Sequence, residues 1–238
     1  MPVKKKKSTK SSTKAKPKNT KQTSGGKTDP KRIAAILKKL DEAYPNAVCE
    51  LNHENAFQLL IATILSAQCT DVRVNQVTAT LFKKYPTPEA FAYANPSELE
   101  QDIRPTGFFR NKTKSVIGAS KAILERFGGE VPRTMEEMLT IPGAARKTSN
   151  VVLGTAFGIA SGVVVDTHVQ RLSNRLDLSH NEDAKKIEQD LMRILPQDRW
   201  ISFSHQMIWH GRRVCHARNP KCVDCNLETL CSSKDKTL

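Results

Sequence analysis

Four cysteines close to the C-terminus constrain this chain more than any other feature. Cys215, Cys222, Cys225 and Cys231 use four of the six cysteines within seventeen residues, separated by six, two and five residues. Two disulfides in one short loop are typical of small secreted domains, and nothing else in the sequence indicates secretion. The run therefore favours a tetrathiolate metal site. Its spacing matches neither paired zinc knuckles nor the ferredoxin run, so both zinc and an iron–sulfur cluster stay open.

Helical periodicity dominates the chain from about Asp29 onward. Capping boxes at Ser97 and Glu100 and at Thr134 and Glu137 predict two helix starts. There are no convincing alternating strands, no internal repeat and no apolar run long enough to span a membrane. The sequence therefore predicts an all-α fold. Apolar residues recur every three or four positions in 57–65, 74–81, 116–127, 184–195 and 200–207.

A tight turn at residues 141–148 joins two of the predicted helices. Its sequence, Ile-Pro-Gly-Ala-Ala-Arg-Lys-Thr, resembles a helix-hairpin-helix. Such a turn points backbone N–H groups and a helix N-terminus outward, which suits a DNA phosphate of any sequence. The usual second glycine of this hairpin is Ala145 here. Alanine would cost on the order of 1 kcal/mol if that position required a positive φ, so we expect either an αR backbone or an altered phosphate contact.

An acidic residue follows a buried extended run in residues 163–171. There Val-Val-Val delivers Asp166 to the start of the next helix, directly before Thr167 and His168. Asp166 is therefore either an ordinary N-cap or a functional carboxylate. The two roles are compatible, because a helix N-terminus favours the charged form of a carboxyl group.

The net charge of +14 points to a polyanionic partner, and most of it lies in the first thirty residues. Residues 1–30 hold ten lysines against the single acidic residue Asp29, and almost no apolar side chains. We expect a disordered basic tail that strengthens non-specific DNA binding. A nuclear address and an inert solubilising extension are the alternatives. A secretory signal is excluded because no apolar core follows the lysines.

Together, the cysteine spacing, the hairpin and the Val-Asp-Thr-His segment resemble the endonuclease III family of bifunctional DNA glycosylases over residues 31–235. The resemblance implies a four-iron-four-sulfur cluster on Cys215, Cys222, Cys225 and Cys231. It implies two helical domains flanking a DNA-binding cleft, namely a six-helix domain (50–160) and a cluster domain (31–49 and 161–238). It also implies that Lys147 is the nucleophile and that Asp166 is the catalytic carboxylate.

The activity implied is base excision repair of oxidised pyrimidines in duplex DNA. A lysine nucleophile displaces the base and then cleaves the strand by β-elimination through a Schiff base, so the enzyme is both an N-glycosylase and an AP lyase. A base inside a duplex must first be extruded into a pocket. The resemblance further implies a monomer without a membrane partner, acting in the cytoplasm at the bacterial nucleoid, or in the nucleus of a eukaryote.

Two further segments match the family positions that handle extrusion. Gln68, in residues 65–71, resembles the residue that fills the gap left by the flipped base, with a helix-connecting turn as the alternative. Phe108, in residues 107–112, resembles the wedge that enters the base stack, with core packing as the alternative. The full set of expected DNA-contacting residues is Gln68, Asp71, Phe108, Arg110, Lys112, Gly143, Ala145, Arg146 and Thr148.

Three other classes of protein share parts of this pattern. A non-catalytic hairpin protein would not need Lys147, Asp166 and the Gln68 segment together. An adenine-mismatch glycosylase would carry a residue other than lysine at position 147. A zinc-ribbon adaptor would need only the cysteines. The combination therefore favours the lysine-dependent glycosylase.

Overall fold

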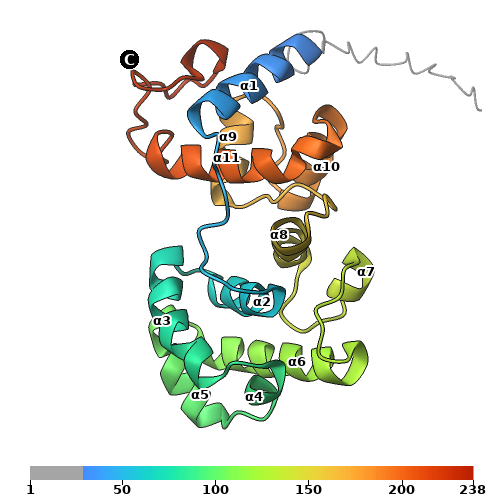
Figure 1. The fold of residues 1–238 in the computed structure, drawn as a ribbon. Helices are drawn as coiled ribbons and strands as arrows, with labels where there is room; N and C mark the ends of the chain where they lie inside the picture. The colour runs from blue at the N-terminus through green and yellow to red at the C-terminus, as the bar shows by residue number, and fades with distance from the viewer. Residues whose placement is uncertain (1–28, 238) are drawn as a thin grey trace, which may run out of the picture.

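A computed structural model describes residues 29–237, and all regular structure in that range is helical (Figure 1). The prediction of an all-α fold is confirmed. Short 3-10 turns, η1 (Arg104–Thr106), η2 (Gln197–Arg199) and η3 (Glu228–Leu230), join some of the helices. The α-helices are α1 (Pro30–Ala43), α2 (Ala56–Leu65), α3 (Asp71–Lys84), α4 (Pro88–Ala92), α5 (Pro96–Ile103), α6 (Phe109–Phe127), α7 (Met135–Met138), α8 (Arg146–Phe157), α9 (Thr167–Arg175), α10 (Ala184–Ile194) and α11 (Trp200–Arg213).

Two hydrophobic cores divide the described chain into two lobes. In Figure 1, α2–α7 form the lower lobe, α1 and α9–α11 form the upper lobe with the C-terminal loop, and α8 lies between them. The lower core includes Leu60, Phe91 and Ile123, whereas the upper core includes Leu40 and Phe203. Because α1 packs against α11, the N-terminal helix completes the lobe built by the C-terminal helices. The residue bounds expected for the two domains stay a prediction.

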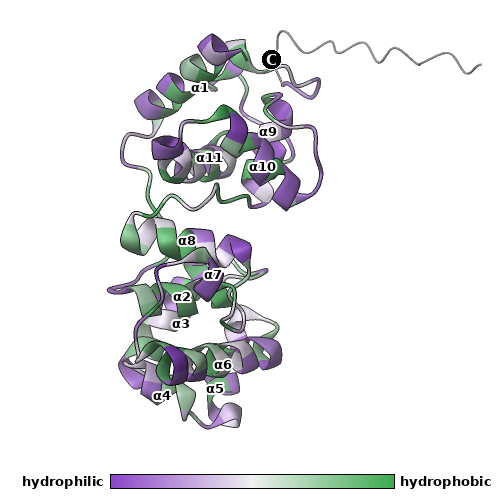
Figure 2. Cartoon of the chain, turned by 90° about the vertical axis from the view of Figure 1, so that its right-hand side faces the viewer, coloured by the Kyte–Doolittle hydropathy of each residue, from purple (hydrophilic) through white to green (hydrophobic). Residues whose placement is uncertain are grey.

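Helix α8 makes the junction between the lobes, and α2 packs against it from the lower lobe. Residues 57–65 of α2 are all buried, and Figure 2 shows α2 coloured mostly as hydrophobic in the lower lobe. Helix α8 buries Val152 and Leu153 in the lower core. On the upper side, a Cβ added at Gly154 would lie 3.2 Å from Ile201 Cγ1, so glycine permits a close approach of α8 to α11.

Most helix starts follow local capping chemistry. Thr134 caps α7 by accepting the Glu137 backbone N–H, as predicted, and its hydroxyl donates to Glu137 Oε2 in place of the backbone bond of a capping box. The prediction that Ser97 caps a helix is wrong. Helix α5 begins two residues earlier than that cap would place it, at Pro96, and Asn95 Oδ1 accepts the backbone N–H groups of Ser97 and Glu98. Proline is favoured at the first helical position, where its missing N–H costs nothing, so the cap falls on the residue before it.

Helix α1 begins inside the segment that was expected to be a tail. Asp29 caps α1 and Pro30 is its first residue, so the helix includes the end of the range 1–30. The disorder expected for residues 1–28 lies outside the described residues. Within residues 29–237, no helix is long and apolar enough to cross a bilayer.

Candidate active site

Side chains from both lobes line one cleft of about 900 Å³. Lys147 lies at the start of α8, Asp166 precedes α9, and Gln68 lies in the turn between α2 and α3. The structure therefore brings together the predicted nucleophile, the predicted carboxylate and the predicted gap-filling amide. A smaller inner pocket continues from the cleft, and Lys147 and Asp166 line it as well.

The Lys147 amine is exposed and has no hydrogen bond or ion pair with any residue of the range 29–237. It occupies the second position of α8, which starts at Arg146. Val151, one turn later on the same helix face, lines the inner pocket with it. Lys147 therefore points into the cleft with its amine available to a ligand.

Asp166 is the N-cap of α9, as the sequence predicts. Its Oδ1 atom accepts the backbone N–H groups of His168 and Val169, each at 2.8 Å. Its other oxygen has no partner within the described residues. The buried run before it is fixed in part by the Val164 backbone, which donates to Ser204 Oγ at 3.0 Å. One oxygen thus holds the helix, and the residue as a whole lines the cleft.

The position in the hairpin that requires a positive φ is Gly143, not Ala145. Gly143 has φ +80°, and an added Cβ would lie 2.8 Å from Ser115 Cβ. Ala145 has φ −66° and ψ 166°, an extended conformation that alanine adopts without strain. The backbone is therefore neither left-handed nor αR at this position. Ala145 caps α8 without any side-chain bond, and Thr148 lies half-buried in the first turn of that helix.

Gln68 and Phe108 both have left-handed backbones, with φ 54° and φ 47°. Such values are uncommon for residues other than glycine, and for a bulky side chain they mark a turn or strain. Phe108 is 64% exposed, which excludes core packing as its role. Arg110 beside it is exposed and lies against the Phe109 ring. Both residues predicted to handle extrusion are therefore exposed on turns with a left-handed backbone.

Three residues predicted to contact DNA have protein partners instead. Lys112 is only 5% exposed and donates to the Thr106 carbonyl at 2.7 Å, so it supports the loop from inside. Burial also lowers the Lys112 pKa. Asp71 accepts from Arg212 at 2.7 Å. Arg146 donates through Nε to Glu188 at 2.7 Å. The prediction of direct phosphate contacts is wrong for Lys112 because its amine is inside the protein. The other two are engaged in ion pairs.

Sequence reasoning missed Arg212 and Glu188 as residues of this region. Arg212 of α11 lines the cleft and pairs with Glu50 and with Asp71. These partners lie 162 and 141 residues away in sequence, so no local pattern indicates them.

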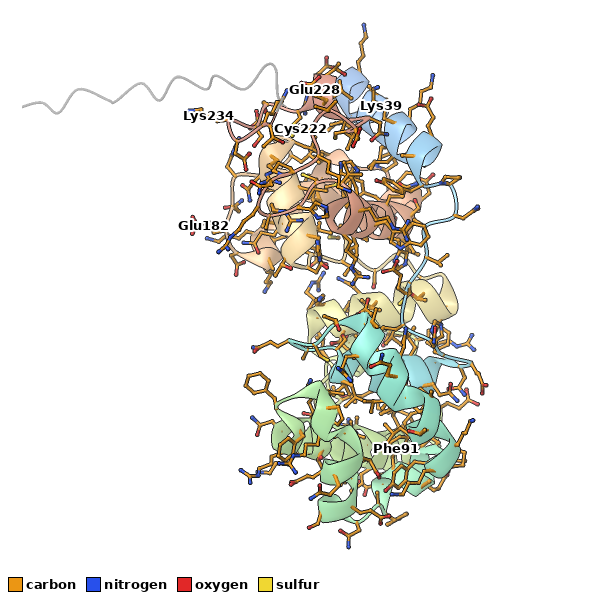
Figure 3. The ribbon with its side chains drawn as sticks, turned by 90° about the vertical axis from the view of Figure 1, so that its left-hand side faces the viewer. Lys39, Phe91, Glu182, Cys222, Glu228 and Lys234 are labelled. Atoms are coloured by element: carbon orange, nitrogen blue, oxygen red, sulfur yellow. The ribbon has the colours of Figure 1, made fainter. Side chains whose placement is uncertain are left out.

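The four clustered cysteines line one pocket in the upper lobe. Figure 3 shows Cys222 near Glu228, at the opposite end of the molecule from Phe91 in the lower core. Arg175 Nη1 lies 3.1 Å from Cys215 Sγ, and His210 Nε2 lies 3.4 Å from Cys225 Sγ. Burial raises the pKa of Cys225 to about 11.

Within residues 29–237, no group of three or more His, Cys, Asp or Glu side chains is arranged to hold a single metal ion. Four convergent thiols with nearby N–H donors nevertheless form a donor set that suits an iron–sulfur cluster. The chemistry of these residues therefore fits the group implied by the sequence.

Residues 61–197 match the family described as HhH-GPD superfamily base excision DNA repair protein. The endonuclease III of Synechocystis sp. is 57% identical over 201 residues, covering 84% of this chain and 90% of that protein. A structure titled as a non-covalent endonuclease III–DNA complex matches with a TM-score of 0.82 and 43% identity, covering 86% of this chain and 95% of the other. A trapped endonuclease III–DNA covalent intermediate also matches with a TM-score of 0.82, at 42% identity, covering 86% of this chain and 96% of the other.

The hairpin geometry predicts opposite outcomes for its two small residues. Gly143→Ala should lower the free energy of unfolding by about 1–3 kcal/mol, because the left-handed backbone and Ser115 both oppose a Cβ. Ala145→Gly is the matched control and should change it by less than about 0.5 kcal/mol, since glycine is accepted at an N-cap. Urea denaturation measures both. Equal effects of the two substitutions would contradict the assignment.

Proposed function

This chain belongs to the endonuclease III family of the HhH-GPD superfamily, and we propose that Lys147 and Asp166 perform its chemistry together in the cleft that both line. Members of this family are DNA glycosylases and AP lyases of base excision repair, and so is this protein. The observation that carries the residue assignment is the free Lys147 amine and the free Asp166 oxygen lining the same cleft.

Lys147 is the nucleophile in this proposal. Its neutral amine attacks C1′ of the damaged nucleotide, the glycosidic bond breaks, and the base leaves with the bonding electrons and takes up a proton. The C1′–O4′ bond then opens to give an iminium, which acidifies the C2′ proton. Loss of that proton expels the 3′ phosphate by β-elimination, and water releases the lysine.

Asp166 stabilises the positive charge that develops on the sugar as the glycosidic bond breaks. A carboxylate suits an oxocarbenium-like transition state. Oδ1 is committed to the helix cap, so the unpartnered oxygen is the one that faces the sugar. The same bonds hold the carboxylate in place, which lowers the cost of organising the charge when the substrate binds.

Gln68 and Phe108 handle the extrusion of the damaged nucleotide from duplex DNA. Their outward positions on left-handed turns suit an amide that fills the gap and a ring that stacks on the opened duplex. The exposed Arg110 and the uncapped start of α8 supply phosphate contacts of the kind that carry no sequence information. The substrates proposed are oxidised pyrimidines and abasic sites, taken by a monomer in the cytoplasm at the nucleoid.

The four cysteines hold a four-iron-four-sulfur cluster in this proposal. When bound, the cluster supplies metal–thiolate bonds that fix the C-terminal loop. Arg212 and Arg213, which end α11, lie directly before this loop. Cys215, Cys222, Cys225 and Cys231 thereby determine where the basic residues near the C-terminus lie.

Substitution of the nucleophile separates binding from chemistry. Lys147→Gln should bind lesion DNA within about threefold of wild type but lose strand cleavage by at least about a thousandfold, because removal of a nucleophile abolishes the covalent route. Fluorescence anisotropy measures the DNA affinity, and a gel-based single-turnover assay measures the rate of strand cleavage. Lys121→Gln, an exposed lysine of α6, is the control and should behave as wild type. Retained cleavage by Lys147→Gln would place the nucleophile elsewhere.

The carboxylate has its own matched pair of variants. Asp166→Asn keeps an N-cap of similar strength and removes the charge, so single-turnover cleavage should fall about a hundredfold while unfolding changes by less than about 1 kcal/mol. Asp183→Asn alters the equivalent cap of α10, outside the cleft, and should leave the rate unchanged. A loss of stability with a normal rate per folded molecule would mean that Asp166 serves only as a cap.

Loss of one cysteine tests the metal site. Wild-type protein should contain iron with acid-labile sulfide and absorb visible light, whereas Cys222→Ser should lose both, together with at least about tenfold in affinity for undamaged duplex DNA. Ser232→Ala in the same loop should retain all three properties. Zinc in the wild-type protein, or normal DNA affinity in the metal-free variant, would refute this part of the proposal.

A further inference from the structure

The buried carboxylate of Glu188 links α10 of the upper lobe to α8 at the junction between the lobes. Glu188 of α10 is only 4% exposed. Its Oε2 atom accepts from Arg146 Nε at 2.7 Å, and its Oε1 atom accepts from Asn150 Nδ2 at 2.8 Å. A buried charge is costly unless it is paired and hydrogen-bonded. Any movement of α8 that breaks these two bonds is therefore opposed by the cost of leaving the Glu188 carboxylate buried without a partner.

The two donors to Glu188 fix the rotation of α8 about its axis. Arg146 and Asn150 are four residues apart and lie on one helix face. Lys147 and Val151 form the next face, which lines the inner pocket. One residue corresponds to about 100° of helix rotation. A carboxylate that holds the Arg146 face with both oxygens therefore also sets the direction of the Lys147 side chain.

The same carboxylate also contacts the segment that leads to Asp166. A Cβ added at Gly162 would lie 2.1 Å from Glu188 Oε1, so the backbone there passes directly over the carboxylate. Ser161 beside it donates to Asn150 Oδ1 at 2.9 Å. Asp166 follows Gly162 by four residues. Glu188 is thus packed between the two pieces of chain that carry the catalytic groups.

The start of α8 lacks a side-chain N-cap, and its local side-chain bonds come from Ser149 Oγ to the Ala144 and Ala145 carbonyls. Ala145 offers no side-chain cap, unlike Asp166 at α9 or Asp183 at α10. Apolar packing holds the body of α8, and the Arg146–Glu188 contact is the side-chain bond that ties its first turn to the other lobe.

We propose that Glu188 is a positioning residue for the reaction, which sets the Lys147 amine relative to Asp166 across the lobe junction. This inference rests on the roles proposed above for Lys147 and Asp166. A displacement of about 1 Å of a reacting group costs on the order of a hundredfold in rate, so a small rotation of α8 is sufficient to reduce turnover.

A second carboxylate with an arginine donor and an amide donor serves as the control for loss of an ion pair, although its side chain is 48% exposed against 5% for Glu188. Asp41 of α1 accepts from Arg199 Nη1 of η2 at 3.0 Å and from Gln206 Nε2 of α11 at 2.9 Å, so it too has an arginine donor and an amide donor. All of these residues lie within the upper lobe, and none of them lines the cleft or the inner pocket. Asp41→Asn therefore removes a similar ion pair without touching the junction.

Glu188→Gln, Glu188→Ala and Asp41→Asn should be compared by three measurements on the full chain. These are single-turnover cleavage of saturating duplex with one abasic site, affinity for a duplex with a tetrahydrofuran abasic analogue, and urea unfolding. Glu188→Gln should slow cleavage at least about tenfold and Glu188→Ala about a hundredfold, with affinity within about twofold of wild type. Asp41→Asn should cleave within about twofold of wild type. Glu188→Gln keeps one side-chain oxygen as an acceptor, so its cleavage rate can be measured even if Glu188→Ala does not fold.

Arg146→Gln distinguishes positioning from a direct phosphate contact. If Arg146 acts through Glu188, Arg146→Gln should slow cleavage as Glu188→Gln does, and the double variant should be no slower than either single one. If Arg146 binds phosphate, Arg146→Gln should weaken DNA binding and Glu188→Gln, which releases it, should tighten binding. That second pattern would overturn the proposal.

Equal rates per folded molecule for Glu188→Gln and Asp41→Asn would also overturn it, because the carboxylate would then be merely structural. Failure of the underlying function is a different result. In that case Lys147→Gln would still cleave in the same assay, whatever the Glu188 variants do.

Discussion

The site depends on one helix, α8, which must pack on two hydrophobic cores at once. Its apolar residues Val152 and Leu153 are buried in the lower core, and Gly154 brings its backbone close to Ile201 of the upper lobe. The N-terminus of α8 is left at the edge of both cores, where the cleft opens. Lys147 therefore lies between lobes because α8 has no freedom to lie elsewhere.

Polar contacts complete the junction where apolar packing ends. Glu188 joins α10 to α8, and Arg212 joins α11 to Glu50 and to Asp71 of α3. These ion pairs neutralise most of the acidic side chains that line the cleft. Asp166 is the exception, because it keeps one oxygen without a partner among the described residues. Asp166, the carboxylate proposed to stabilise charge on the sugar, is thus the acidic side chain of the cleft that no ion pair neutralises among the described residues.

Local interactions were predictable from sequence, and long-range ones were not. The Asp166 cap spans two or three residues, and Thr134 and Glu137 bond each other, so the patterns around them were sufficient. The prediction of Ser97 as an N-cap was wrong because Pro96 takes the first helical position and Asn95 is the cap. The buried Lys112 contradicts the usual exposure of lysine. Nothing near Arg146 in sequence indicates its partner, which lies 42 residues away.

The central claim is that the free amine in the cleft is the one that joins the DNA. Borohydride reduction of the wild-type protein on duplex with one abasic site, followed by digestion and peptide mass spectrometry, locates the covalent bond directly. The account predicts a sugar adduct on Lys147, in the peptide that begins α8. An adduct on any other amine, including a lysine of residues 1–28, would contradict it.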